Sequence, residues 1–328
     1  MLQENIVSII QDAKNALNRS GGLKAVYFIG CGGSWAASHI AFDFVAHENA
    51  SMLVVGHINS NEFVHALPKS VGPNALVIVT SMKATPESVE ALRTAKQRGA
   101  YTIAVTGGPE TLMAQTADRF VVYTHSEAYT CAFHSVAVNL RLGVELLAQF
   151  EGYPHYTQMI EAIDSTDDRL ARLIKKYAPK GIRFAVDHRD KKIFHIFSSG
   201  CMYGVGYSEA YCHFAEMQQL NAIPFNSAEF FHGPFEVTVP EQPSILFINL
   251  GRTRELDLRA KRFLEEFCDY LTILDAADFG MDDICAEIQE YIAPLLMGPA
   301  FRYAYVERLA EERQHPMTIR RYMWKFDY

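Results

Sequence analysis

Residues 25–38 read AVYFIGCGGSWAAS. The apolar run at residues 26–29 lacks polar residues at alternate positions, which is typical of a strand buried on both faces. The glycine turn that follows leads into residues 35–38, which we read as the start of a helix. A buried strand that passes through glycines into a helix predicts an α/β fold with a parallel sheet.

The same pattern returns in the second half of the chain, at one constant offset. Residues 193–196, Ile-Phe-His-Ile, repeat the apolar run of residues 26–29, and Gly200 stands at the same offset from Gly33. A second phrase, Asn-Ser-Asn-Glu-Phe-Val-His at residues 59–65, returns at this offset as Asn-Ser-Ala-Glu-Phe-Phe-His at residues 226–232. Three matches in one register predict a duplicated domain, and 328 residues are enough for two domains.

Short apolar runs alternate with longer amphipathic stretches along both halves. We expect strands at residues 25–29, 51–56, 75–80, 102–106, 119–124, 193–197, 222–225, 244–250 and 270–274. Alternating strands and helices predict two tandem doubly wound parallel sheets, each sandwiched by helices in three layers. The predicted domains are residues 1–153 and 154–328, and residues 156–189 are expected to form helix that links them.

The composition argues against several functions. Hydrophobic residues make up 49% and charged residues 21% of the chain, the balance of a soluble globular protein. A net charge of −8 without a basic run argues against a nucleic-acid partner. Because no apolar stretch approaches the about 20 residues that cross a bilayer and no signal peptide is evident, we expect a cytoplasmic protein without membrane partners. Six scattered cysteines predict reduced thiols and no metal site.

Two loops of the first half are candidate anion sites. In the first loop, Gly32, Gly33 and Ser34 open a helix. Glycines there allow close backbone approach, and free N–H groups at a helix start favour an anion. A plain strand-to-helix turn explains this loop equally well, and it is not a dinucleotide-binding fingerprint.

The second loop is Ser-Met-Lys-Ala-Thr-Pro-Glu-Ser at residues 81–88. Thr85 suits the N-cap of the helix that follows. Ser81, Thr85 and Ser88 would surround this helix start with hydroxyls, and Lys83 adds a positive charge. Ordinary capping explains Thr85 without a ligand. However, both loops follow strand ends, where ligands gather in parallel sheets.

A helix expected at residues 207–220 carries a candidate acid/base. Ala210, Phe214 and Met217 have the spacing of a core face, and Glu216 lies among apolar neighbours that could desolvate it. Burial raises the pKa of a carboxyl group, which suits proton transfer to and from carbon. From spacing alone, an exposed helical glutamate is the better interpretation.

The phrase Glu-Phe-Phe-His-Gly-Pro at residues 229–234 is more informative. Gly-Pro ends any helix and places His232 at a chain corner, a constraint that a core histidine does not need. The first copy of the phrase lacks this Gly-Pro, and the asymmetry indicates that one copy carries an active site. A lone histidine is nevertheless more often structural than catalytic.

Together these motifs resemble the sugar isomerase (SIS) family. The matching stretches are residues 31–34, 81–88, 216–218 and 229–234, and the spacing from Glu216 to His232 is also the family's. The family comprises tandem doubly wound domains that bind phosphosugars, as in the isomerase half of glucosamine-6-phosphate synthase. With its C-terminal tail, the chain is most similar to fructosamine-6-phosphate deglycases, which cleave phosphorylated Amadori products to a sugar phosphate and an amino acid. The resemblance spans essentially the whole chain.

The resemblance implies a role for each candidate residue. Glu216 would be the acid/base at the sugar carbons, and His232 would move protons at oxygen. Other residues would bind the phosphate or the sugar of the substrate: Gly32, Gly33, Ser34, Ser81, Lys83, Thr85, Ser88, Glu229 and Lys325. The implied chemistry needs no metal or other cofactor. We expect a homodimer or larger assembly in which the histidine can reach the site from a neighbouring subunit.

The chain departs from the family at the second loop. The family pattern is Ser-x-Ser/Lys-Gly-x-Thr, whereas Lys83-Ala84-Thr85 is one residue shorter and lacks the glycine. Fewer backbone N–H groups would then face the phosphate, and the charge of Lys83 would compensate. Two other functions stay open: an aldose–ketose or aminosugar phosphate isomerase with the same proton shuttle, and a phosphosugar-binding regulator without turnover.

Overall fold

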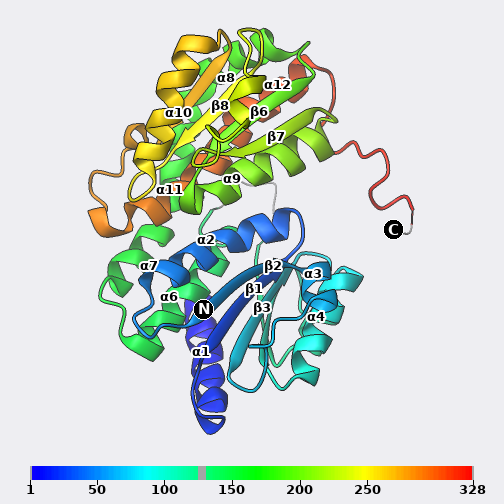
Figure 1. The fold of residues 1–328 in the computed structure, drawn as a ribbon, viewed down its shortest axis with the longest axis vertical. Coiled ribbons are helices and arrows are strands. Elements are labelled where there is room, and N and C mark those ends of the chain that lie inside the picture. Colours follow the sequence, from blue (N-terminus) through cyan, green and yellow to red (C-terminus); the bar gives the residue numbers. More distant parts are fainter. Residues whose placement is uncertain (1, 125–130, 327–328) are drawn as a thin grey trace. The chain divides into compact units, whose positions relative to one another are not determined.

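The structure of the chain, a computed structural model, describes residues 2–124 and 131–326 (Figure 1). The chain divides into two compact units, residues 1–166 and 167–328. Each unit contains one parallel sheet, with five strands in the first and four in the second. The predicted α/β class with parallel sheets is confirmed. Within the described ranges, no helix combines the length and apolar character that a bilayer crossing requires.

The first unit alternates helices and strands. Its helices are α1 (Leu2–Arg19), α2 (Gly33–Glu48), α3 (Ser60–His65), α4 (Pro86–Gln97), α5 (Leu112–Thr116), α6 (Ser135–Glu151) and α7 (Tyr156–Asp164). Its strands are β1 (Ala25–Gly30), β2 (Val54–Asn59), β3 (Ala75–Ser81), β4 (Tyr101–Thr106) and β5 (Arg119–Val122), in the order β2-β1-β3-β4-β5. Helices α1, α2 and α6 pack together, α3, α4 and α5 form a second group, and the sheet lies between the two groups (Figure 1).

The second unit repeats this strand order in the form β7-β6-β8-β9. Its strands are β6 (Ile193–Ser198), β7 (Asn221–Asn226), β8 (Ser244–Ile248) and β9 (Leu271–Asp275). Its α-helices are α8 (Thr166–His188), α9 (Tyr203–Ser208), α10 (Arg254–Phe267), α11 (Ala286–Phe301) and α12 (Glu307–Glu312). Two π-helices, η2 (Glu209–Met217) and η5 (Arg302–Val306), and three 3₁₀ turns, η1 (Gly200–Met202), η3 (Pro234–Val237) and η4 (Ala276–Phe279), complete it.

Each predicted strand is present among the described residues. Every residue of β1 and of β3 is buried, as expected for strands covered by helices on both faces. The second strand begins at Val54 instead of Ser51, because its register pairs Val54 with the first residue of β1, Ala25. The stretch at residues 156–189 is helical, as predicted, and consists of α7 and α8.

The first strand and glycine of the repeat need a correction of one residue. Strands β1 and β6 begin at Ala25 and Ile193, so their offset is one residue larger than the offset of the repeated phrase. The matching left-handed glycines are Gly32 (φ +54°) and Gly200 (φ +52°), so the predicted match of Gly33 to Gly200 is wrong. Apolar runs without alternation carry little register information, whereas strand pairing and the sign of φ define it.

Candidate functional site

Three hydroxyl groups form a hydrogen-bonded chain beside the first turn of α4. The Oγ atom of Ser88 lies 3.1 Å from Thr85 Oγ1 and 3.2 Å from Ser60 Oγ. Ser81, the last residue of β3, accepts a hydrogen bond from the Thr85 N–H through its Oγ at 3.3 Å. The structure therefore brings the predicted Ser81, Thr85 and Ser88 together at the carboxyl ends of the strands.

Thr85 occupies the N-cap position of α4, as predicted, but its hydroxyl does not cap the helix. It pairs instead with Ser88, whose side chain is only 1% exposed. Capping therefore does not account for the Thr85 hydroxyl, which lies on the half-buried side of the cluster near the exposed Lys83. The fully buried Ser60 was missed by the sequence analysis, although it lies in the repeated phrase at residues 59–65.

The shortened loop turns at Ala84, which has φ +52°. A non-glycine residue in this left-handed region carries a cost of about 1–2 kcal/mol. The loop therefore retains the backbone conformation that a glycine would favour, and an alanine provides it. The Ala84 methyl packs against the core cluster that contains Phe63 and Val89, which holds the turn in place.

The first glycine loop connects β1 to α2 with little space. A Cβ atom on Gly30 would lie 2.8 Å from the backbone of Ser34, so the chain crosses too closely here for any side chain. Gly32 is the N-cap of α2, and Gly32 and Gly33 are both exposed. Ser34 lies in the first helical turn, half-buried, with its N–H donated to Cys31 O at 3.0 Å. The loop thus presents exposed backbone at the start of a helix.

The helix that carries Glu216 is a π-helix for most of its length. Helix α9 ends at Ser208, η2 continues to Met217, and Gln219 is left-handed with φ +54°. The helix therefore begins and ends earlier than the predicted 207–220, at Tyr203 and Met217, and is wider over its π-helical part.

The π-turns also change which side chains of this helix are buried. Ala210 and Phe214 lie in the core as predicted, but the next buried residue after them is Gln218, and Met217 is only half-buried. The reason is that π-turn hydrogen bonds span five residues, as in Gln218 N–H to His213 O at 3.0 Å.

Glu216 forms an ion pair with the C-terminal tail, residues 313–326. The Nε atom of Arg320 donates to Glu216 Oε1 at 2.7 Å, and the side chains of Arg320 and Glu216 are 11% and 21% exposed. Glu216 is thus partly shielded, but by a guanidinium group as well as by apolar neighbours. Burial and the negative charge of Glu216 raise the pKa of the Cys212 thiol to about 12, so this thiol stays protonated.

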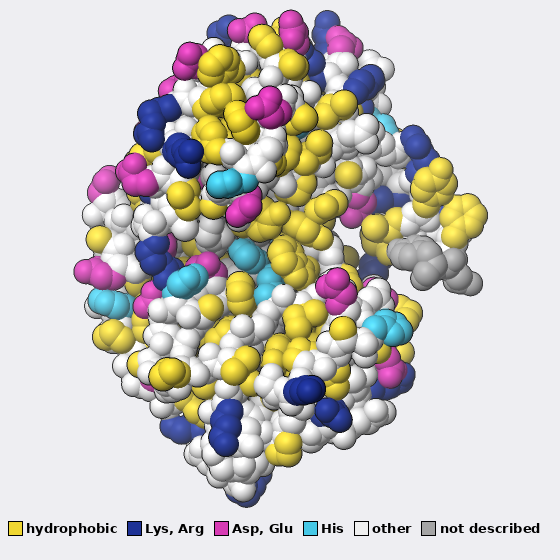
Figure 2. Space-filling model, viewed as in Figure 1, with side chains coloured by type: hydrophobic (Ala, Val, Ile, Leu, Met, Phe, Trp, Pro, Cys, Tyr) yellow, Lys and Arg dark blue, Asp and Glu magenta, His cyan; other side chains and the backbone are white. Residues whose placement is uncertain are grey.

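The tail is attached to the end of η2 by further contacts. Gln218 Nε2 donates to His315 O at 2.8 Å, and Arg321 donates to Gln219 Oε1 at 2.7 Å. Beyond these contacts the tail shows basic and large apolar side chains to solvent (Figure 2). Lys325 is one of these exposed residues. The structure therefore places Lys325 on the segment whose Arg320 contacts Glu216.

Glu229 and His232 lie on one turn that a buried phenylalanine anchors. Asn226 Oδ1 accepts from Ala228 N–H at 2.9 Å, and His232 N–H donates to Glu229 O at 2.9 Å. Phe230 is fully buried against other aromatic rings, while Glu229 and His232 are exposed. The turn therefore presents both predicted polar side chains outward.

Comparison with known proteins supports the family assignment. The SIS domain model matches residues 23–144. The chain is 32% identical to the fructosamine deglycase FrlB of Bacillus subtilis, over all of this chain and 98% of that protein. The chain belongs to the SIS family. Within it, the fructoselysine 6-phosphate deglycase of Escherichia coli is 22% identical over 83% of this chain and 77% of its own length.

A solved structure from Salmonella typhimurium LT2, described as a candidate phosphosugar isomerase, has the same fold. It is 37% identical, with a TM-score of 0.93, and the match covers all of this chain and 99% of that one. The resemblance inferred from the motifs is therefore confirmed, and it places this SIS chain in the deglycase branch.

The structure separates two residues that the SIS motif pairs. Glu216 precedes β7, whose first residue pairs with the start of β6, whereas Glu229 and His232 follow the last residue of β7. Strand β7 has six residues, so at about 3.3 Å per residue its first and last Cα atoms lie roughly 16 Å apart. Within one SIS chain, Glu216 and His232 thus flank opposite ends of the edge strand β7.

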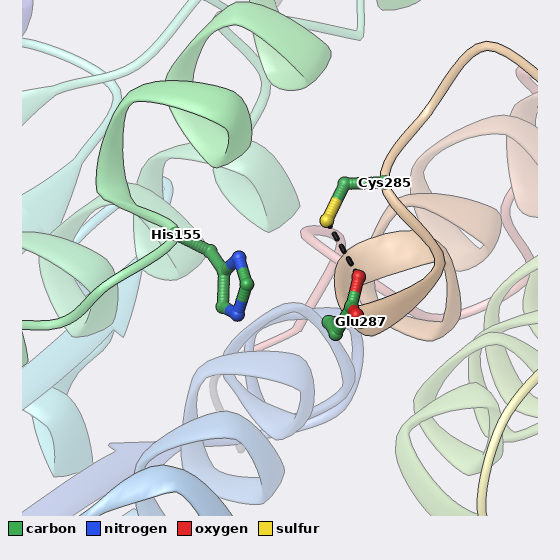
Figure 3. Close-up of side chains that lie close together, drawn as sticks. All are labelled: His155, Cys285 and Glu287. Carbon is green, nitrogen blue, oxygen red and sulfur yellow. Dashed lines mark hydrogen bonds between the residues drawn. The ribbon is translucent and has the colours of Figure 1, made fainter.

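One cysteine–carboxylate pair lies outside the predicted site residues. Cys285 Sγ donates to Glu287 Oε2 at 2.7 Å at the start of α11 (Figure 3). This hydrogen bond raises the pKa of the partly exposed Cys285 thiol. The thiol is therefore held in its protonated, weakly nucleophilic form.

Proposed function

We propose that this chain is a deglycase that cleaves a 6-phosphorylated sugar–amino acid conjugate of the Amadori type to a hexose 6-phosphate and a free amino acid. The observation that carries the proposal is the 32% sequence identity with a fructosamine deglycase. The match covers the whole chain, so it includes both units and the tail. We read the two units as tandem SIS domains, because their sheets share one strand order. In this reading the domains are residues 1–153 and residues 154–328, with the linking helix and the tail in the second.

In the proposed reaction, Glu216 acts on the two carbons next to the amine. The substrate carries a ketone at the second carbon and the amine at the first. Glu216 removes a proton from the first carbon to give an enaminol, then returns a proton to the second carbon. The product is an imine of an aldose phosphate, and water hydrolyses it to the aldose 6-phosphate and the amino acid. One placed acid/base contributes about 10²–10⁴-fold in rate.

His232 is proposed to move protons at the ring and hydroxyl oxygens of the same sugar. Glu216 and His232 flank opposite ends of strand β7, which supports a site whose two groups come from different chains. We therefore propose a homodimer or larger assembly in which a second copy contributes His232. Its exposed position on the turn after β7 is accessible to a second copy.

The substrate phosphate is proposed to bind at the hydroxyl cluster and the first glycine loop of the first unit. Thr85, Ser81 and Ser88 supply hydroxyls, and the exposed backbone of Gly32 and Gly33, with Ser34, opens α2. Lys83 adds charge at the outside of the cluster. Glu229 and Lys325 complete the proposed substrate contacts.

The test measures free amino acid released from fructoselysine 6-phosphate and from fructose-asparagine 6-phosphate. We expect the wild type to release amino acid and Glu216→Gln to release at most about one hundredth as much. Glu161→Gln, an exposed change on α7, is the matched control. Near-normal release by Glu216→Gln would refute the role of this carboxylate.

An aldose–ketose isomerase is the second candidate, because the similar Salmonella structure is described as a candidate phosphosugar isomerase. The same proton shuttle would interconvert fructose 6-phosphate and an aldose phosphate. Conversion of fructose 6-phosphate with no amine released from either conjugate would favour the isomerase. Absence of any turnover, with sugar phosphate still bound, would favour a regulator.

A further inference from the structure

One nitrogen of the Arg320 guanidinium, Nη2, makes no hydrogen bond to the described part of the chain. Its Nε donates to Glu216, and its Nη1 donates to Met317 O at 2.7 Å and to Ile319 O at 3.0 Å. Nη2 has no hydrogen-bond acceptor among residues 2–124 and 131–326, although the side chain is only 11% exposed. The whole side chain is largely covered, so Nη2 is the one guanidinium nitrogen left to donate to a ligand beside Glu216.

The guanidinium is held in a fixed orientation. Two backbone carbonyls of the tail bind Nη1, the ring of Trp324 lies 5.7 Å from the guanidinium carbon, and the tail itself is attached through Gln218. A planar guanidinium held in this way binds an anion without losing further rotamer freedom. Nη2, beside Glu216, is therefore a donor whose position is fixed before a ligand binds.

The proposed substrate has one anionic group that this donor site suits. An Amadori conjugate of an amino acid carries a phosphate and a carboxylate, and the phosphate is assigned to the hydroxyl cluster of the first unit. Because Nε and Nη1 are already used, Nη2 of Arg320 is free to donate a charge-assisted hydrogen bond to one carboxylate oxygen. In the asparagine conjugate the carboxylate lies on the carbon bonded to the departing nitrogen, so it arrives near Glu216, which acts on the sugar carbon bonded to the same nitrogen.

We propose that Nη2 of Arg320 binds the carboxylate of the amino acid part of the substrate, while Nε of the same guanidinium holds Glu216. Arg320 is then a specificity residue that selects glycated amino acids over glycated simple amines. Its neighbour Arg321 does not share this role, because it is exposed and donates to Gln219. The inference rests on the proposed deglycase function and adds the part of the substrate that is recognised.

The test compares two conjugates that differ only in the carboxylate. The two conjugates are fructose-asparagine 6-phosphate and its β-alaninamide counterpart, in which the carboxylate next to the glycated nitrogen is replaced by hydrogen. We expect the wild type to prefer the carboxylated member by about 10- to 100-fold in kcat/KM. Arg320→Gln should reduce that ratio to within about threefold, and Arg320→Lys should give an intermediate ratio.

Arg321→Gln is the matched control and should leave the ratio unchanged. The ratio separates recognition from a merely structural role, since misplacement of Glu216 lowers both conjugates equally. Equal losses for both conjugates in Arg320→Gln, or a wild type without preference, would overturn the assignment while amine release still supports a deglycase. Failure of the wild type to cleave fructose-asparagine 6-phosphate would overturn this inference, and failure to cleave fructoselysine 6-phosphate as well would overturn the proposed function.

Discussion

Glu216 and His232 lie on opposite sides of strand β7, one before its first residue and the other after its last. The backbone segments that carry the two side chains of the SIS motif therefore meet opposite ends of one strand. The separation favours an active site that two copies of the chain build together.

Mixed subunits provide a direct test of such a shared site. Glu216→Gln and His232→Ala should each be nearly inactive alone, because each homodimer lacks one group at every site. After the two variants are dissociated and reassembled together, we expect about one quarter of the wild-type activity, since half of the dimers contain one intact site. Activity that stays at the level of the separate variants, with mixed dimers shown by two affinity tags, would contradict a shared site.

Ala84 carries backbone strain that a glycine would relieve. Ala84→Gly should raise the free energy of unfolding by about 1 kcal/mol, because φ +52° is unfavourable for alanine and acceptable for glycine. Chemical denaturation of the folded chain measures this difference. Ala117→Gly is the control, because Ala117 packs against the same cluster at an ordinary φ of −68° and should lose stability. Equal destabilisation by both changes would disprove strain at Ala84.

Thr85 is expected to act on the substrate phosphate instead of on helix stability. Thr85→Val should raise KM for the phosphorylated conjugate by about tenfold and leave kcat nearly unchanged, because a hydrogen bond to a charged group is lost. Steady-state kinetics measure both constants. Thr111→Val should do the opposite, since Thr111 caps α5 by accepting from Ala114 N–H at 3.3 Å. It should cost about 1 kcal/mol of stability without a change in KM.

Asp257 should make the second unit less stable at neutral pH. It is fully buried in α10, and burial raises its pKa to about 6, which the hydrogen bonds from Ser199 Oγ and Asn249 N–H only partly oppose. Between pH 4 and 6 the folded state keeps a proton that the unfolded state loses. The free energy of unfolding therefore falls as pH rises from 4 to 6, by about 3 kcal/mol in total, and this contribution stays lost above pH 6.

Asp257→Asn should therefore stabilise the protein at pH 7 and have little effect near pH 4. The control, Asp275→Asn, should show the opposite trend. Burial disfavours ionisation of Asp275, but hydrogen bonds from Arg254 outweigh it and lower the pKa. Its loss should cost stability at pH 7 and less as pH falls through its folded pKa. Thermal unfolding of both variants from about pH 2 to 8 measures the trends, and parallel curves would argue against a raised pKa for Asp257.

Local sequence determined the elements and the loops of this protein. Buried strands were identified because apolar runs such as residues 26–29 meet glycine turns, and the N-cap at Thr85 followed from its position before a proline. The turn at residues 229–234 was also predictable, since Gly-Pro defines a corner without help from distant residues. These features depend on backbone preferences and on period, which are properties of short stretches.

Tertiary structure decided what distant segments do together. Three features depend on contacts beyond short stretches of sequence. They are the registers of β1 with β2 and of β6 with β7, the π-turns that bury Gln218 instead of Met217, and the hydroxyl of Ser60 beside Ser88. The same holds for the contact of Arg320 with Glu216 across a long stretch of chain, and for the distance between Glu216 and His232. A sequence motif specifies which residues are present, but the direction of a strand between two of them determines whether one chain can use both.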